Sequence, residues 1–354
     1  MSQQSERYTL FISSPIEPEY VEQIRAVDPD QVEVIYEPDL YPPTRYVADH
    51  HGPSDFRLTG DAEKKWYERL READFLLDFP FQVPQGSSIS DVCPNLKWVQ
   101  TTSAGVGQQV VKLGLQDSDL IITTSSGVHS RPLAEFVFLA LLSHVKLLPR
   151  LQRDQKAHVW DRFCSDELDG KTLAVVGPGK IGRQVAAIGR CFNMRVLAMG
   201  RTGGQERAAE LGVDEVFTRD QLHEMLGQAD AVVLSCPHTP DTEGLMDAAA
   251  FEALKPGVMF VNISRGQVVD HAALLKHLQS GKIAFAGLDV FATEPLPADS
   301  PFWDLPNVLI NPHSASTALS ENQKITDLLC HNLRCILDDR QDEMRNVLDK
   351  QRMY

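Results

Sequence analysis

The sequence predicts two α/β domains with parallel sheets, the second inserted into the first. Three observations support this fold class. The chain has 354 residues, which suggests two domains at roughly 100–200 residues each. Short apolar strands alternate with helix-like stretches, as in parallel sheets with helical crossovers. A last helix-like stretch, 317–337, would return the chain to the first domain.

The composition excludes several classes of protein. Hydrophobic residues make up 43% and charged residues 23%, which is ordinary for a globular chain and argues against disorder or a fibrous fold. A formal net charge of −15 argues against binding nucleic acid or an anionic membrane, since both need a positive surface. No apolar run approaches the roughly 18 residues that span a bilayer. The first ten residues lack a basic region followed by an apolar one, so no signal peptide is expected.

The cysteines point to the compartment. There are six of them, and none forms a CxxC pair. A disulfide framework and a structural zinc site are therefore not expected. We expect a cytoplasmic protein with no bound metal.

The first domain is predicted from short strands and one clear amphipathic helix. Its strands are expected at 8–12, 32–36, 75–79 and 96–101. Val21, Ile24 and Val27 would line one face of a helix between the first two strands, and a second helix is expected over 61–73. Residues 37–60 are rich in proline, histidine and glycine without a period, so we expect them to be irregular.

The pattern of apolar residues changes near residue 127, where a second domain is expected to begin. A long helix begins at about Pro132, and its apolar residues cover more than one face. Two alternatives follow: the helix is buried within its own domain, or it forms a subunit interface. Strands are then expected at 173–176, 195–199, 231–234, 259–262, 284–288 and 308–310. We place one domain at 127–315 and the other in two pieces, 1–126 and 316–354.

A glycine-rich turn follows the first strand of the second domain. It consists of Gly177, Pro178, Gly179, Lys180, Ile181 and Gly182. It opens a helix inside a βαβ unit, which is the context that a dinucleotide-binding motif requires. The first glycine would allow the tight turn, the second the approach of the pyrophosphate, and the third the packing of helix on strand. A glycine-rich turn without a ligand is the weaker alternative in this context.

The end of the next strand bears on the choice of cofactor. An NAD site places Asp or Glu there, whereas an NADP site accommodates the 2′-phosphate with Arg. This chain has Arg201 and Thr202 and no carboxylate at the expected place. The guanidinium fork of Arg201 can pair with a phosphate, so NADP(H) is favoured over NAD(H). If Arg201 instead stacks on adenine or caps the surface, NAD would be permitted.

Three further segments carry polar residues after predicted strands. They are Asn262–Gly266, Gly287–Pro295 and Asn311–Ala315. Together with the glycine-rich turn, they resemble the D-isomer-specific 2-hydroxyacid dehydrogenase family, in order from about residue 96 to 347. The resemblance implies two Rossmann-like or flavodoxin-like domains with the nucleotide domain inserted into a substrate domain. It also implies hydride transfer between the cofactor and a small 2-keto or 2-hydroxy acid, D-specific and of the glyoxylate or hydroxypyruvate type.

The chemistry of that reaction needs the residue types that these segments supply. A cation must bind the carboxylate and carbonyl, and Arg265 can do so with two parallel hydrogen bonds. A proton donor must act near neutral pH, and His313 can. Glu294 could hold the imidazole in one orientation and favour its protonated form. By resemblance, Arg265, Glu294 and His313 are the catalytic residues of the family.

The resemblance assigns further residues. The substrate carboxylate would be bound by Arg265 and by a loop of small residues whose backbone N–H groups can form an anion nest, Ser103, Ala104, Gly105 and Val106. Other residues would contact the cofactor: Cys236, Pro237, Thr242, Ile263, Ser264, Asp289 and Ser314. A homodimer through the helix that begins at Pro132 is also implied.

Two alternative functions remain open at this stage. One is a formate- or phosphite-type dehydrogenase of the same superfamily, although Glu294 argues against the formate branch, which typically lacks the acidic member of the trio. The other is a nucleotide-sensing, corepressor-like binding protein with vestigial chemistry. Turnover of 2-keto acids distinguishes the latter from an enzyme.

Overall fold

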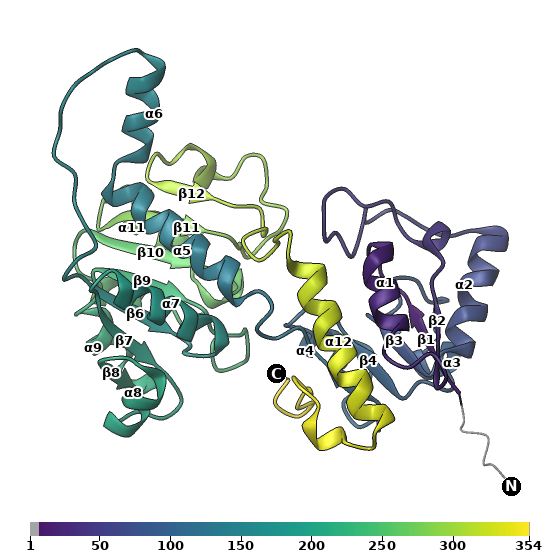
Figure 1. The fold of residues 1–354 in the computed structure, drawn as a ribbon. Helices are drawn as coiled ribbons and strands as arrows, with labels where there is room; N and C mark the ends of the chain where they lie inside the picture. Colours follow the sequence, from purple (N-terminus) through teal and green to yellow (C-terminus); the bar gives the residue numbers. More distant parts are fainter. Residues whose placement is uncertain (1–6, 354) are drawn as a thin grey trace, which may run out of the picture. The chain divides into compact units, whose positions relative to one another are not determined.

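The chain forms two compact α/β units in the computed structural model, which describes residues 7–353 (Figure 1). The first unit takes Met1–His129 and Thr317–Tyr354, and the second takes Ser130–Ser316. Each unit has one parallel sheet with helices, so the predicted fold class is confirmed. The signal-peptide prediction rests partly on residues 1–6, which lie outside the described residues.

The first unit is built on a five-stranded parallel sheet in the order β2-β1-β3-β4-β5, a flavodoxin-like order. Its strands are β1 (Tyr8–Ile12), β2 (Val32–Ile35), β3 (Phe75–Leu77), β4 (Trp98–Gln100) and β5 (Ile121–Thr123). Its helices are α1 (Pro18–Arg25), α2 (Gly60–Glu72), α3 (Ile89–Val92), α4 (Gly107–Lys112) and α12 (Glu321–Leu337). Trp66 of α2 and Trp98 of β4 are fully buried in the core of this unit.

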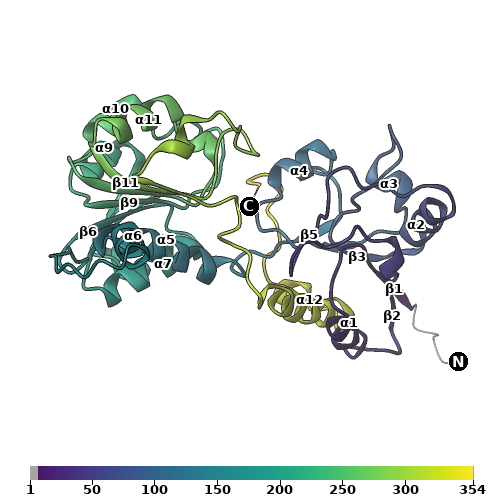
Figure 2. The same ribbon diagram turned by 90° about the horizontal axis from the view of Figure 1, so that it is seen from above.

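The last helix completes the first unit. Ile325, Leu329 and Leu333 of α12 are fully buried in the same core, and α12 lies beside α1 (Figure 2). The chain therefore returns to its first unit after the second, as the sequence predicts. The predicted start of this helix at about residue 317 was wrong, because 317–318 are irregular, 319–320 form a turn and the helix begins at Glu321.

The second unit has a seven-stranded parallel sheet in the order β12-β11-β10-β9-β6-β7-β8. Its strands are β6 (Thr172–Val176), β7 (Arg195–Met199), β8 (Glu215–Phe217), β9 (Ala231–Leu234), β10 (Val258–Asn262), β11 (Ile283–Leu288) and β12 (Val308–Ile310). Its helices are α5 (Ser130–Val145), α6 (Leu148–Lys156), α7 (Lys180–Cys191), α8 (Gln205–Leu211), α9 (Leu222–Leu226), α10 (Ala248–Ala253) and α11 (His271–Gln279). The strand order reverses between β6 and β9, and ligands bind at the carboxyl ends of the strands beside such a point.

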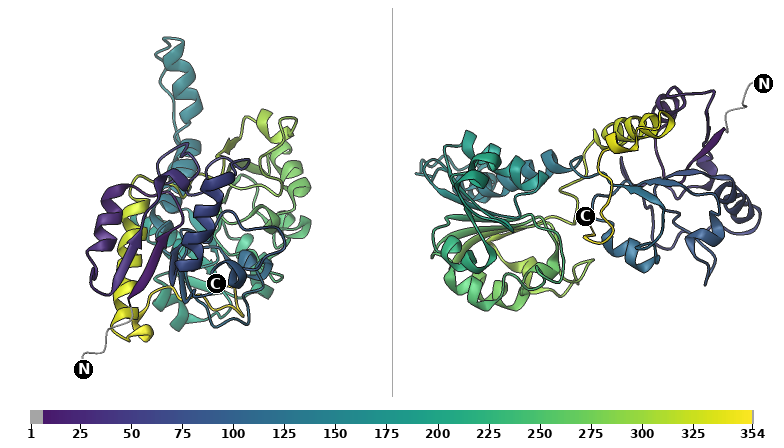
Figure 3. Two further views of the ribbon diagram at one scale, coloured as in Figure 1. Left: turned by 90° about the vertical axis from the view of Figure 1, so that its right-hand side faces the viewer. Right: turned by 90° about the horizontal axis from the view of Figure 1, so that it is seen from below.

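The long apolar helix α5 is buried mostly within its own unit, where it packs against α7, β10 and β11. Leu139 is its exception, since its side chain is half exposed. The next helix, α6, carries no buried residue, and Figure 3 shows it extending away from the sheet. Trp160, in the segment after α6, is 97% exposed.

Membrane-spanning segments were sought among residues 7–353. No single helix there is long and apolar enough to cross a bilayer. The pair α5 and α6 would qualify together by length and composition, with a bend of 64° between the two helices.

Candidate active site

The glycine-rich turn joins β6 to α7 in the geometry that a phosphate site needs. Gly177 has a left-handed backbone with φ of 94°, and a Cβ there would lie 2.7 Å from the Cys236 backbone. A Cβ on Gly182 would collide with the Gly177 carbonyl oxygen. Gly177 therefore requires glycine for its backbone angle and its approach to Cys236, and Gly182 requires it for its approach to Gly177.

The same turn leaves room and hydrogen-bond donors for an anion. No atom lies within 4 Å of the place a Cβ on Gly179 would take, so the backbone is open there. The N–H groups of Ile181 and Gly182, in the first turn of α7, have no acceptor among the described residues. The positive end of the helix dipole adds to their attraction for a phosphate. These features fit the pyrophosphate of a dinucleotide.

Arg201 and Thr202 follow β7 at the carboxyl edge of the sheet. They stand in the loop between β7 and α8, and both side chains are exposed. This loop approaches the glycine-rich turn, because a Cβ on Gly200 would lie 3.5 Å from the Pro178 ring. The structure thus brings Arg201 and Thr202 to the same edge of the sheet as the glycine-rich turn.

The loop after β9 lies against the same turn. Ser235 donates its hydroxyl to the Gly177 carbonyl at 2.9 Å, and Cys236 is buried. The loop is closed by Thr242, whose hydroxyl donates to the Pro237 carbonyl at 2.6 Å. Burial raises the pKa of the Cys236 thiol to about 11, so the thiol stays neutral at physiological pH. Cys236 is therefore placed to pack rather than to react.

Arg265 stands in a tight turn directly after β10. Asn262 organises this turn by accepting from the Ser264 N–H at 3.0 Å and from its hydroxyl at 2.7 Å. The Asn262 amide also donates to the Arg265 carbonyl at 3.2 Å. Ile263 and Ser264 are buried, whereas Arg265 is exposed and donates from Nη1 to the Ser264 carbonyl. The turn therefore presents the guanidinium at the carboxyl edge of the sheet.

The glycine after Arg265 brings this turn against the loop that follows β11. A Cβ on Gly266 would collide with the backbone of Phe291 and Ala292. The Phe291 N–H in turn donates to Glu294 Oε1 at 2.9 Å. Arg265 and Glu294 are thus held by segments in backbone contact, although they are 29 residues apart in the sequence.

Glu294 and His313 form a direct pair. His313 Nδ1 lies 2.8 Å from Glu294 Oε2, and about two-fifths of each side chain is exposed. His313 has a left-handed backbone with φ of 54°, and its N–H donates to the Asp289 carbonyl at 2.9 Å. With Nδ1 turned to the carboxylate, Nε2 is the ring nitrogen left to exchange a proton with a substrate. The structure therefore brings Glu294 and His313 within hydrogen-bonding distance of each other.

Asp289 supports the segment that carries His313. Its Oδ1 accepts from the Asn311 side chain at 2.7 Å and from the Ala315 N–H at 3.0 Å. Its side chain is buried, and burial raises its pKa. Ser314 is exposed and donates to the Pro312 carbonyl. In this structure Asp289 acts on the shape of the loop, while its contact with a cofactor remains a prediction.

The predicted substrate loop belongs to the first unit, after β4. Ser103 and Ala104 are partly exposed, Gly105 is exposed and Val106 is buried. The Ser103 carbonyl accepts from the Thr101 hydroxyl at 2.8 Å and from the Ser125 N–H at 3.1 Å. The N–H groups of Ala104, Gly105 and Val106 have no acceptor within residues 7–353. Three consecutive unbonded N–H groups can bind an anion.

Three organising residues received no role from the sequence. Asn262 shapes the Arg265 turn, Asn311 fixes Asp289, and Asp78 accepts from Thr102 beside the substrate loop. For the two asparagines a signal exists, because Asn directly after a strand is a common turn residue. Among the described residues, no group of three His, Cys, Asp or Glu side chains is arranged to hold a metal.

The family model described as "D-isomer specific 2-hydroxyacid dehydrogenase, NAD binding domain" matches residues 138–315, half of the chain. The glyoxylate reductase of Korarchaeum cryptofilum is 30% identical over 77% of this chain and 82% of its own length. The chain belongs to the D-isomer specific 2-hydroxyacid dehydrogenase family. Its nucleotide-binding unit carries Arg265, Glu294 and His313 together.

Other members of the family are also similar. The D-3-phosphoglycerate dehydrogenase of Mycobacterium leprae is 35% identical over 81% of this chain, which spans only about half (55%) of that relative. A crystal structure of a D-isomer specific 2-hydroxyacid dehydrogenase from Xanthobacter autotrophicus Py2, in complex with NADPH and MES, is 28% identical. It aligns with a TM-score of 0.74 over 99% of this chain and 100% of that one.

Proposed function

We propose that the protein catalyses reversible hydride transfer between NADP(H) and a small 2-keto or 2-hydroxy acid, with the D-isomer as the hydroxy acid. Glyoxylate and hydroxypyruvate are the leading substrates. The observation that carries the proposal is the His313–Glu294 pair at 2.8 Å, whose loop is in backbone contact with the Arg265 turn. A binding protein needs no such pair, whereas a 2-keto acid reductase needs a held proton donor next to a cation.

Each catalytic residue has one part in the reaction. The bound nicotinamide would supply the hydride. Arg265 binds the substrate carboxylate or carbonyl oxygen and stabilises the negative charge that develops on it. His313 gives its Nε2 proton to the carbonyl oxygen during reduction and takes it back during oxidation. Glu294 accepts from His313 Nδ1, which fixes the ring orientation and stabilises the imidazolium.

The choice of NADP(H) rests on the loop after β7. Arg201 and Thr202 stand at the edge that carries the phosphate turn, and neither neighbour of this pair in the sequence is a carboxylate. A 2′-phosphate would gain a charged, forked donor there, whereas an NAD ribose would lack its usual acidic partner. The NADPH complex of the Xanthobacter relative supports this choice.

The choice of substrate rests on the small size of the substrate loop and on the glyoxylate reductase relative. The phosphoglycerate dehydrogenase relatives favour a second candidate, a phosphorylated 2-keto acid. Formate or phosphite oxidation is less well supported, because the Glu294–His313 pair is suited to donate a proton to a carbonyl oxygen during reduction. A nucleotide-sensing role is also less well supported, because a sensor needs no proton donor of the kind that this pair provides.

We also propose that the protein is a homodimer. The surface that supports this is carried by the second unit, where α5 exposes Leu139 and the segment after it exposes apolar side chains: Leu148, Leu151, Val159 and Trp160. Large apolar side chains exposed on neighbouring segments of one unit support an association site there. Sedimentation equilibrium of the wild type beside Trp160→Ser checks it, and a monomeric wild type would contradict it.

The experiment that tests the function is a substrate panel. NADPH and NADH oxidation would be followed with glyoxylate, hydroxypyruvate, 3-phosphohydroxypyruvate, pyruvate and phenylpyruvate. We expect turnover with a small acid and NADPH, and better kcat/KM with NADPH than with NADH. Tight NADPH binding without turnover of any acid would contradict the proposal and favour the sensor.

A further inference from the structure

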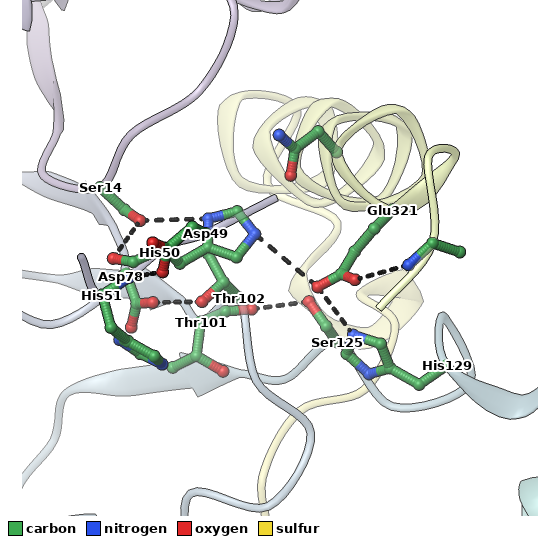
Figure 4. A network of polar contacts seen from close by, with 12 residues as sticks. Ser14, Asp49, His50, His51, Asp78, Thr101, Thr102, Ser125, His129 and Glu321 are labelled. Carbon is green, nitrogen blue, oxygen red and sulfur yellow. Dashed lines mark hydrogen bonds and ion pairs between the residues drawn. The ribbon is translucent and has the colours of Figure 1, made fainter. Parts of the chain in front are cut away.

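An aspartate with a left-handed backbone stands at the carboxyl edge of the first unit's sheet. Asp78 follows β3 directly, has φ of 74°, and is 92% buried, its relative exposure being 8%. In the order β2-β1-β3-β4-β5, the chain places β2 on one side of β1 and the later strands on the other side. The strand order therefore reverses between β1 and β3, and ligands of such sheets bind beside this point. Figure 4 shows Asp78 in the polar network there, where it pairs with Thr102.

Every polar group of Asp78 has a partner, and three of the four partners stand at or after the ends of neighbouring strands. Its N–H donates to the Gln100 carbonyl at 2.7 Å, and its carbonyl accepts from the Ser13 hydroxyl at 2.9 Å. Its Oδ1 accepts from the Phe79 N–H at 2.8 Å, and its Oδ2 accepts from the Thr102 hydroxyl. Asp78 thus ties together the ends of β1, β3 and β4. The buried carboxylate therefore has a hydrogen-bond donor at each of its two oxygens.

The Thr102 bond acts on the substrate loop. Thr102 directly precedes Ser103–Val106, and its buried side chain is turned to Asp78. On the other side, the Ser103 carbonyl is held by Thr101 and Ser125. The backbone is therefore fixed on both sides of the peptide that enters the loop. The unbonded N–H groups of Ala104, Gly105 and Val106 follow immediately.

We propose that Asp78 is a positioning residue for the substrate loop. Through the Thr102 hydroxyl it fixes the backbone conformation in which the N–H groups of Ala104, Gly105 and Val106 bind the carboxylate of a 2-keto acid. This inference rests on the proposed function, which assigns the loop to the substrate. Asp78 itself does not touch the substrate, since a carboxylate would repel another carboxylate.

The charge and the hydrogen bond of Asp78 can be separated by substitution. Asn tolerates the left-handed backbone as Asp does, and its side chain can still bond to Thr102. Asp78→Asn therefore keeps the contact and removes a negative charge from the neighbourhood of an anion-binding loop. Asp78→Ala removes both. For Thr102, the near-isosteric Thr102→Val removes the hydroxyl, and Thr102→Ser keeps it.

The test uses these four full-length variants with NADPH bound, and two readouts. One is the KM of the best 2-keto acid beside the KM of NADPH; the other is the Kd of oxamate, a non-reacting carboxylate mimic, by titration calorimetry. Thr102→Val and Asp78→Ala should raise the KM of the acid and the Kd of oxamate by about tenfold or more, because the loop backbone loses the hydrogen bond that holds it in its binding conformation. The KM of NADPH should not change. Thr102→Ser and Asp78→Asn should match the wild type or bind oxamate more tightly.

Wild-type oxamate affinity in Thr102→Val would overturn the proposal, as would equal losses in Asp78→Asn and Asp78→Ala. If Asp78→Ala does not fold, the Thr102 pair still decides the question. If the wild type binds oxamate but reduces no acid, the proposed function fails while the Thr102 comparison still tests Asp78. A wild type that neither binds oxamate nor reduces an acid contradicts both.

Discussion

The two units of the chain hold their functional residues in different ways. In the second unit, the phosphate turn, the Arg265 turn and the His313 segment are each a short run of sequence placed directly after a strand. In the first unit, the substrate loop depends on Asp78 and Ser125, which lie 24 and 23 residues from Thr102 in the sequence. The predicted site residues of the second unit thus lie in short motifs that can be read in the sequence, whereas the shape of the substrate loop depends on residues outside any motif. Substitutions of single residues in each unit test this contrast.

The largest effect is expected at His313. His313→Asn tolerates the left-handed backbone and removes the proton donor, so kcat should fall by about 10²–10⁴-fold, the usual contribution of a positioned acid. NADPH affinity should stay as in the wild type. His158→Asn is a matched control, because His158 is exposed and has nearly the same backbone angle, φ of 53°. Turnover retained by His313→Asn would remove His313 from the mechanism.

A smaller effect is expected at Arg265. Arg265→Lys keeps the positive charge but loses the fork that binds an oxyanion with two hydrogen bonds. We expect kcat/KM for the 2-keto acid to fall by about tenfold to a hundredfold, which corresponds to one charged hydrogen bond. Arg195→Lys, at the start of β7, is the control, since it pairs with Glu215 at the opposite edge. Equal kinetics in the two variants would contradict the role of Arg265.

The cofactor preference should respond to Arg201. Arg201→Ala should raise the KM of NADPH by about tenfold and leave the KM of NADH nearly unchanged, because only NADPH has the phosphate that Arg201 would bind. Arg190→Ala, at the end of α7, changes the same charge elsewhere in the unit and should alter neither constant. A parallel change for both cofactors would indicate that Arg201 packs on adenine instead.

The smallest effect is on stability and concerns the first unit. Burial lowers the pKa of His50 below its usual 6.5, although Glu321 and Asp78 oppose this shift and His51 adds to it. Below about pH 6.5 the unfolded chain therefore binds a proton that the folded chain does not, and stability falls as the pH drops. His144, His271 and His277 act in the same direction.

His50→Asn preserves a partner for Ser14, which lies 3.2 Å from His50 Nδ1, and removes one of these titrations. The slope of unfolding free energy between pH 7 and 5 should become flatter by up to about 1.4 kcal/mol per pH unit. Urea unfolding at several pH values measures this slope. An unchanged slope would show that His50 is not excluded from protonation by burial.

The sequence predicts the second unit better than the first for a physical reason. β6 and β7 are buried apolar runs joined by a glycine turn, and such local signals need no knowledge of distant contacts. β5 and β8 were missed, although β3, β4 and β12, which also have only three residues, were predicted. The helix α6 was missed because Leu148 and Leu151 are its only large apolar residues, and it buries none of its side chains. The helices α3 and α4 were also missed, because four and six residues are too few to show a helical apolar pattern.

The candidate site divides in the same way. Arg265, Glu294 and His313 are visible in the sequence because each stands in a recognisable motif, and the structure brings them to connected loops. Asp78 has no such motif, since its role depends on a left-handed backbone and on Thr102 in the next strand's loop. Tertiary contacts of this kind become visible only when the strand register is known.

The most direct test of hydride transfer from NADPH to a 2-keto acid is to follow the hydride itself. NADPH that carries deuterium at the transferred position of nicotinamide C4 would be incubated with glyoxylate or hydroxypyruvate and the wild-type protein, with His313→Asn beside it. We predict a 2-hydroxy acid with deuterium at C2, detected by mass spectrometry, and almost none with the variant. NADPH binding without any deuterated hydroxy acid from these or the other 2-keto acids would contradict the proposed hydride transfer.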